Sequence, residues 1–260
     1  MEVRTITGYT LLLLILVTIN TYAISLQDNV GSSQDSILTD YSIEDSLCLT
    51  AYEVIEKYLE AIGGRDLFTE VEDRTTIMRG TAMGQNLTIL VKQKVPAKLY
   101  QEIIVGEMEQ NVYFDGEHGM MVMGDKNIEI EKKELEKLKV EATMNLLLDP
   151  ESYGLKISLA GIEQVDNIDC YIVKMVLPSG LRWQQYYSIE TGFKIKEIKE
   201  IHTEQGLFEQ ESFYSDYRNV DELKFPFKIL QNMGIQKLEL NVSSIKLNTG
   251  ISDETFEIPE

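Results

Sequence analysis

One amphipathic helix stands ahead of a long series of short alternating segments, and this order limits the folds open to the chain. Thr50 and Glu53 have the spacing of a capping box, in which two side chains satisfy backbone donors at a helix N-terminus. Apolar residues then recur on one helix face: Ile55, Tyr58, Leu59 and Ile62. Gly63-Gly64 ends the pattern, because glycine tolerates a positive φ. The sequence therefore predicts a helix over residues 50–64 with a sheet curled over it.

Short strands and a second helix follow. Residues 73–124 contain four or five alternating segments, with the hairpin signal Asp115-Gly116 between two of them. Residues 132–148 then change to a helical period, with a stripe of apolar residues: Leu135, Leu138, Ala142 and Leu146. Asp149-Pro150 ends this predicted helix, because proline disfavours the helical conformation in the residue before it.

Alternating segments return over residues 155–247. The apolar phase shifts after Ile195 and again at Ser243-Ser244, which predicts β-bulges. Pro226 cannot donate a ladder hydrogen bond and indicates an edge or bulged position. No boundary divides the core, so residues 48–260 are expected to form one domain. We expect a mostly-β α+β fold, with an antiparallel sheet of about eleven strands curled over two or three helices.

The first residues have the pattern of an export signal. Residues 1–23 combine Arg4, an apolar run of about eleven residues and a small-x-small ending, as in a signal peptide. The apolar run is too short to span a membrane. An uncleaved anchor is the alternative. Residues 24–47 are acidic and lack periodicity, which predicts a flexible leader. Export would permit a disulfide between Cys48 and Cys170, the only cysteines, although two separately buried thiols explain them equally simply.

The charge balance limits the partners. Lys+Arg 24 against Asp+Glu 43 gives a formal charge of −19. Nucleic acid and anionic lipid surfaces would be repelled, so neither is expected as the main partner. The simpler interpretation is that the charge keeps an exported protein soluble.

The sequence offers little to a catalytic mechanism. Its two histidines, His118 and His202, lie in no catalytic or metal-binding motif, and two distant cysteines make no zinc site. Carboxylates are so frequent that a chance pair carries no information. We therefore expect no enzyme, no metal and no cofactor.

Methionine gives the most suggestive signal. The segment Gly119–Gly124 reads GMMVMG, and methionine is flexible, polarisable and frequent in adaptable binding surfaces. Core filling is the plainer explanation for each methionine alone. Together with a curled sheet, they indicate a hydrophobic cavity. Its candidate lining combines the two helix stripes, the methionine segment and the single tryptophan: Ile55, Tyr58, Leu59, Ile62, Met121, Met123, Leu135, Leu138, Leu146 and Trp183.

Several short motifs carry a family resemblance. They are Ala61-Ile62-Gly63-Gly64, Arg79-Gly80, Phe114-Asp115-Gly116, Asp216-Tyr217-Arg218 with Val220-Asp221, Lys224-Phe225-Pro226 and Phe256-Glu257-Ile258-Pro259. In this order the chain resembles LolA-like outer-membrane lipoprotein-sorting proteins over residues ~50–259. The resemblance implies a half-open antiparallel β-barrel with helices as a lid over a hydrophobic cavity.

The resemblance also implies a function. It favours a soluble, monomeric periplasmic carrier for lipoproteins or other acylated or lipidic ligands. The alternative is a non-enzymatic periplasmic interaction module with a filled barrel, accessory to envelope proteases or assembly machinery. Co-purifying lipid would separate the two.

Overall fold

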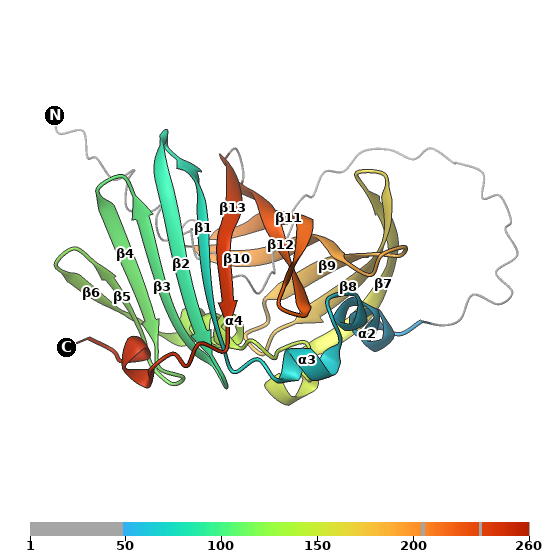
Figure 1. Ribbon diagram of the computed structural model, residues 1–260, viewed down its shortest axis with the longest axis horizontal. Coiled ribbons are helices and arrows are strands. Elements are labelled where there is room, and N and C mark those ends of the chain that lie inside the picture. The colour runs from blue at the N-terminus through green and yellow to red at the C-terminus, as the bar shows by residue number, and fades with distance from the viewer. Residues whose placement is uncertain (1–48, 204–205, 234–235, 260) are drawn as a thin grey trace, which may run out of the picture.

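The computed structural model describes residues 49–203, 206–233 and 236–259 (Figure 1). The expected signal peptide (1–23), the leader (24–47) and Cys48 lie outside these ranges. Cys170 is a buried thiol, and its pairing with Cys48 stays a prediction. No helix in the described part of the chain is both long and apolar enough to span a bilayer.

Thirteen antiparallel strands form one continuous sheet in the described ranges. Two helices precede it, α2 (Ala51–Ala61) and α3 (Arg65–Thr69). Six strands follow: β1 (Asp73–Ala82), β2 (Gln85–Lys94), β3 (Lys98–Val105), β4 (Met108–Phe114), β5 (Gly119–Met123) and β6 (Lys126–Ile130). After helix α4 (Lys132–Ala142) and a 3₁₀ turn (Pro150–Tyr153) come seven more: β7 (Lys156–Val165), β8 (Ile168–Val176), β9 (Arg182–Ser188), β10 (Lys194–Thr203), β11 (Gly206–Val220), β12 (Leu223–Met233) and β13 (Gln236–Leu247). A second 3₁₀ turn, Asp253–Phe256, ends the fold.

The mostly-β class with three helices is confirmed, but a barrel of about eleven strands is not, because the sheet is open and has thirteen strands. The sheet has thirteen strands in the order β6-β5-β4-β3-β2-β1-β13-β12-β11-β10-β9-β8-β7, and its edges, β6 and β7, do not pair. Strand β6 has the sequence KNIEI, and four of its five residues are exposed. The sequence therefore lacks the apolar alternation that predicts a strand. β7 runs on through Gly161, with a register shift between Leu159 and Gly161.

The pairing of β1 with β13 joins two meanders, because every other pair of neighbouring strands is consecutive in sequence. Thr76 pairs with Ile245 and Ile77 with Ser244, but Met78 pairs with Val242. Ser243 is therefore the extra residue, which confirms the phase shift expected there. Beyond β13 the chain is fixed by Asp73, whose carboxylate accepts hydrogen bonds from the backbone N–H of Thr249 (2.8 Å) and Gly250 (2.7 Å).

Two other strand irregularities match the sequence. In β10, Ile195 and Ile198 pack in the same cluster although their spacing is odd, so the phase shifts between them as expected. Pro226 pairs with Tyr217 of β11, whereas β12 pairs with β13 only from Lys228 onward. Pro226 thus occupies a locally unpaired side of β12, which confirms the edge position.

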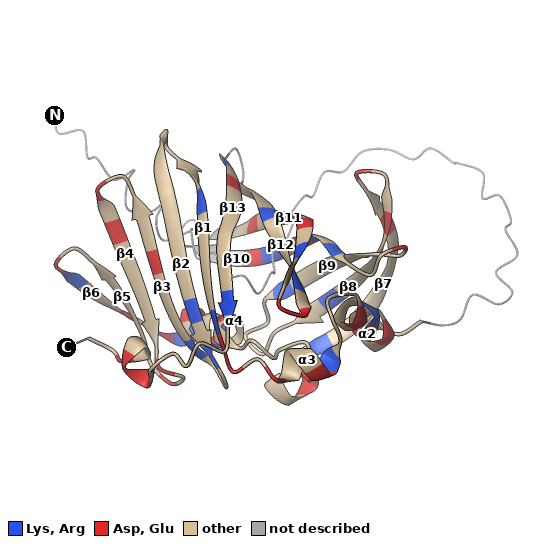
Figure 2. Ribbon diagram, viewed as in Figure 1, with Lys and Arg blue, Asp and Glu red and all other residues tan. Residues whose placement is uncertain are grey.

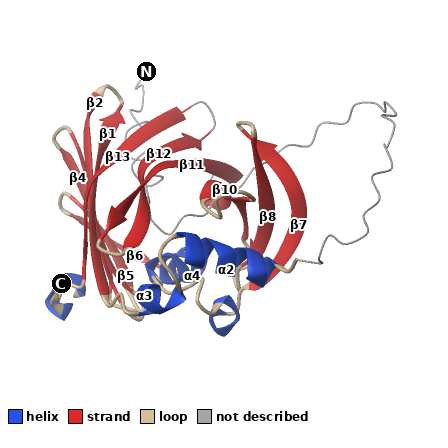
Figure 3. Cartoon of the chain, turned by 45° about the vertical axis from the view of Figure 1, so that its right-hand side comes forward, coloured by secondary structure: helices blue, strands red, loops and turns tan. Residues whose placement is uncertain are grey.

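The three helices of the described ranges, α2, α3 and α4, lie on the concave side of the curved sheet (Figure 3). One apolar cluster covers β1–β5 and parts of β11–β13, and it includes Leu138 and Ala142 of α4. A second cluster joins α2 to β8 and β9 and includes Val140, Leu146 and Leu147. A small third cluster contains Cys170 and no helical residue.

The first helix forms as expected. Thr50 and Glu53 make the capping box: the Glu53 N–H donates to Thr50 Oγ1 (3.2 Å), and the Thr50 N–H donates to Glu53 Oε2 (2.6 Å). Two glycines let α2 approach neighbouring turns. A Cβ on Gly63 (φ +130°) would lie 2.7 Å from the Glu222 carbonyl oxygen, and one on Gly192 (φ +74°) would lie 2.8 Å from the Lys57 carbonyl oxygen.

The second helix is shorter than expected, because α4 ends at Ala142 and not at residue 148. Thr143 is extended, and residues 144–148 form turns. Met144 packs in the first cluster, whereas Leu146 and Leu147 pack in the second. Residues 131–155 as a whole connect β6 to β7 and thus link the two edges of the sheet. We call this segment the strap.

Leu59→Ala tests whether the α2 face is a true part of the core. Leu59 is fully buried, so its truncation should lower the free energy of unfolding by ~2–5 kcal/mol. Glu60→Ala, on the exposed side of the same helix, is the control and should change it by less than ~0.5 kcal/mol. Urea denaturation of both variants gives the comparison. Equal, small losses would place the α2 face outside the core.

Candidate functional site

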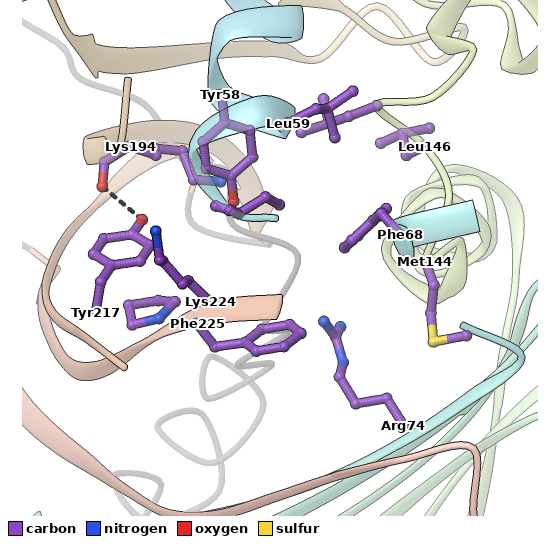
Figure 4. A pocket seen from close by; sticks show the side chains of 13 residues that line it. Tyr58, Leu59, Phe68, Arg74, Met144, Leu146, Lys194, Tyr217, Lys224 and Phe225 are labelled. Carbon is purple, nitrogen blue, oxygen red and sulfur yellow. Dashed lines mark hydrogen bonds between the residues drawn. The ribbon is translucent and has the colours of Figure 1, made fainter. Parts of the chain in front are cut away.

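A small pocket lies where α2, α3 and the turn after α4 meet the sheet (Figure 4). Its volume is about 40 Å³. The apolar part of its lining includes Leu59, Ile62, Phe68, Met144, Leu146, Leu147, Phe225 and Pro226. The polar part consists of two tyrosines and three cations: Tyr58, Tyr217, Arg74, Lys194 and Lys224. The pocket therefore combines apolar walls with positive charge and no carboxylate.

The end of α2 is fixed to β12 beside this pocket. The Lys224 backbone N–H donates to the Ile62 carbonyl at 2.7 Å, and Lys224 Nζ lies 3.3 Å from the Ala61 carbonyl oxygen. The close approach of Gly63 to Glu222 holds the same junction. These contacts place Tyr58, Leu59 and Ile62 over the sheet.

The structure brings together four of the ten residues expected to line a cavity. Tyr58, Leu59, Ile62 and Leu146 line the pocket. Ile55 and Trp183 are buried in the second apolar cluster, and Met121 and Leu138 are buried in the first, with Leu135 packed against it. Met123 is half-buried at the end of β5. Ligand contact by any of them stays a prediction.

Sequence reasoning missed the charged residues of the interior. Arg74, Lys194, Lys199, Glu141 and Glu197 are all buried. In an alternating strand, charged positions indicate the solvent face, so these residues gave the opposite signal. The one usable clue was the phase shift in β10, because it turns Lys194 and Glu197 toward the same side. Figure 2 shows acidic residues on α2 and α3 and at hairpin ends.

Lys194 is the most deeply buried cation of the pocket. Its Nζ lies 3.1 Å from Glu197 Oε2, and both side chains are almost fully buried. Burial lowers the pKa of Lys194 to about 8, although Glu197 opposes this shift. The ammonium also lies over the rings of Tyr58 (5.7 Å) and Tyr214 (5.4 Å), whose faces attract cations.

Arg74 links the pocket to α4. Its Nη2 donates to Gln93 Oε1 at 2.5 Å, and Gln93 Nε2 donates to the Glu141 carbonyl at 3.1 Å. Burial lowers the pKa of Arg74 to about 10. Among the described residues, no atom accepts a hydrogen bond from Arg74 Nε. A buried donor of this kind is uncommon in folded proteins.

A buried ion pair holds α4 to β10. Lys199 Nζ lies 3.6 Å from Glu141 Oε1, with both side chains almost inaccessible to solvent. Lys199 also lies over the Trp183 ring at 5.7 Å. In the described ranges, no group of three His, Cys, Asp or Glu side chains is arranged to hold a metal ion.

The fold is LolA-like. A LolA superfamily protein from Nitrosomonas europaea aligns with a TM-score of 0.56 at 16% identity, covering 81% of this chain and 98% of that one. A DUF1329 family protein from Desulfovibrio piger aligns with a TM-score of 0.52 at 14% identity (78% and 95% covered). A putative outer membrane lipoprotein-sorting protein domain from Vibrio parahaemolyticus aligns with a TM-score of 0.51 at 10% identity (79% and 95% covered). Neither a family model nor a curated protein matches the sequence.

Removing one member of the Glu141–Lys199 pair should be costly. Lys199→Met leaves the Glu141 carboxylate buried without this cation, so the free energy of unfolding should fall by ~3–5 kcal/mol. The double variant Glu141→Met/Lys199→Met should recover most of that loss, because it removes both charges. Lys228→Met breaks the exposed Lys228–Glu239 pair and should cost less than ~1 kcal/mol.

Urea denaturation of Glu141→Met, Lys199→Met and the double variant gives the coupling energy. A Lys199→Met loss no larger than that of Lys228→Met would show that the buried pair does not hold α4.

Proposed function

We propose that this protein is a non-enzymatic carrier that binds the acyl chains of lipoproteins or other lipids on its concave face. The observation that supports it is the strap: a helix and a turn that cover the apolar concave face of an open sheet. An acyl chain needs an extended apolar surface, and two apolar clusters meet the helices on this face.

The described structure is the closed form of such a carrier. Ligand pockets commonly measure about 300–1,000 Å³. The pocket of about 40 Å³ holds only two or three water molecules. An acyl chain must therefore displace part of the strap, so that the two apolar clusters line one groove.

Helix α4 is suited to displacement because its contacts are mixed. Two of its five buried residues, Lys137 and Glu141, are charged. Its apolar anchors divide between clusters, with Leu138 and Ala142 in the first and Val140 in the second. An element with few apolar contacts opens at lower free energy than the core.

The similar structures support the carrier only through their fold. Outer-membrane lipoprotein sorting is named for the Vibrio parahaemolyticus domain, and identities of 10–16% establish no shared ligand. We extend that role to this chain as a proposal. An exported, periplasmic location belongs to the same proposal and rests on the sequence of residues 1–23.

The filled interior favours a second candidate. A module that acts by contact with envelope proteins needs no cavity, and the concave face here is closed and carries buried charges. In that case, α4 would be a fixed part of the core. Ligand binding separates the two candidates.

Gly119→Val tests the carrier by weakening the closed form. A Cβ at Gly119 would lie 2.9 Å from Leu138 Cδ2 and 3.3 Å from Leu135 Cδ1, so valine pushes α4 away from β5. The variant should melt at a lower temperature and bind an uncharged acyl probe, such as a pyrene-labelled fatty alcohol, about 3- to 10-fold more tightly. Fluorescence titration and thermal melting provide both readouts.

Ile198→Ala is the matched control. Ile198 is buried in the third cluster, which contains no residue of α4, so its truncation should lower stability without raising affinity. Wild type and Gly119→Val that both fail to bind the probe would contradict the carrier and leave the interaction module.

A further inference from the structure

We infer that the pocket beside α2 binds the anionic head group, carboxylate or phosphate, of an acyl ligand whose chain lies beneath the strap. This inference rests on the proposed carrier function and specifies its ligand class. The net negative charge of the chain is expected to repel extended anionic surfaces such as nucleic acid and lipid membranes. A single anionic group bound in a buried pocket is compatible with that expectation.

Three cations reach the pocket from three different strands. Arg74 extends from β1, Lys194 from β10 and Lys224 from β12 (Figure 4). No acidic side chain among the described residues lines this pocket. In a chain with a formal charge of −19, a site with this composition is selective for negative charge. The volume of about 40 Å³ fits a carboxylate and leaves no space for its chain.

The charges around the pocket are incompletely balanced within the described residues. Lys194 has Glu197 as an ion-pair partner. Arg74 and Lys224 instead contact uncharged groups: the oxygens of Gln93 and Ala61, and the rings of Phe225 and Phe193. Arg74 Nε, on a side chain only 4% exposed, is a buried donor without an acceptor in this region. An anion between the cations would supply that acceptor and reduce the repulsion between Arg74 and Lys194.

The apolar walls give the ligand a direction. Met144 and Leu146 belong to the turn of the strap, and Phe68 belongs to α3. An alkyl chain attached to the bound anion therefore leaves the pocket past these residues, toward the surface that the strap covers. Uncharged acyl ligands would occupy that surface without using the cations.

Calorimetric titration below the micelle concentration tests the inference with four twelve-carbon amphiphiles. They are dodecanoate, dodecyl phosphate, dodecanol and dodecylammonium. Wild type should bind an anionic amphiphile at least tenfold more tightly than dodecanol, and dodecylammonium most weakly. Comparison of dodecanoate with dodecyl phosphate identifies which anion the pocket prefers.

Three variants assign the effect to the pocket. Arg74→Gln and Lys224→Gln should each weaken anion binding about 10- to 100-fold, as expected for a lost charge-assisted hydrogen bond, and change dodecanol binding less than about threefold. Lys228→Gln is the matched control on the same strand: its side chain is 47% exposed and pairs with Glu239, so binding should not change. If Arg74→Gln fails to fold, the half-buried Lys224 decides the question.

The outcomes separate the two proposals. Equal binding of dodecanol and the anions, unchanged in Arg74→Gln and Lys224→Gln, overturns the head-group site and leaves the carrier intact. Preference for dodecylammonium also overturns the head-group site. Binding of none of the four amphiphiles contradicts the carrier, and the head-group site fails with it.

Discussion

The pairing of β1 with β13 is the interaction on which the rest of the molecule depends. Every other ladder joins strands that are consecutive in sequence, so each meander can form locally, whereas this one joins distant parts of the chain. Only when the ladder forms do the two meanders share a concave face. The hydrogen bonds that Asp73 accepts fix one end of this contact, and the bulge at Ser243 shifts the register in the middle of the ladder. The helices would otherwise have no common surface to cover.

The interior of this sheet is not a simple apolar groove. Buried ion pairs such as Glu141–Lys199 contribute little net stability, because desolvation offsets their attraction. Hydrophobic residues would fill the same space at least as well. Charges at these positions therefore indicate specificity: they set where α4 rests and what chemistry the adjoining pocket accepts. A LolA-like fold thus holds a polar centre between two apolar clusters.

The sequence predicted the structure correctly where the spacing of apolar residues matches the buried positions. The α2 helix, its capping box and the phase shift at Ser243 all follow from apolar spacing that the structure confirms. The prediction failed where side chains contradict the usual link between polarity and exposure. The β6 strand is missed because its positions are exposed, and α4 was extended because Leu146 continued its stripe. Arg74 and Lys194 resemble solvent-facing residues until the three-dimensional neighbours are known. The pocket was therefore predictable only through its apolar half.

The strap has a mechanical consequence because its two ends are attached to opposite edges of one sheet, at β6 and β7. Because both ends of the strap are attached to the sheet, the distance between the strap and the concave face depends on how strongly the sheet is curved. When a ligand moves the strap away from the concave face, the edge strands β6 and β7 must approach each other or the sheet must twist further. Loading would then be transmitted through the backbone to the convex surface. A partner that binds the convex surface and flattens the sheet would, by the same coupling, pull the strap toward the concave face and release the ligand.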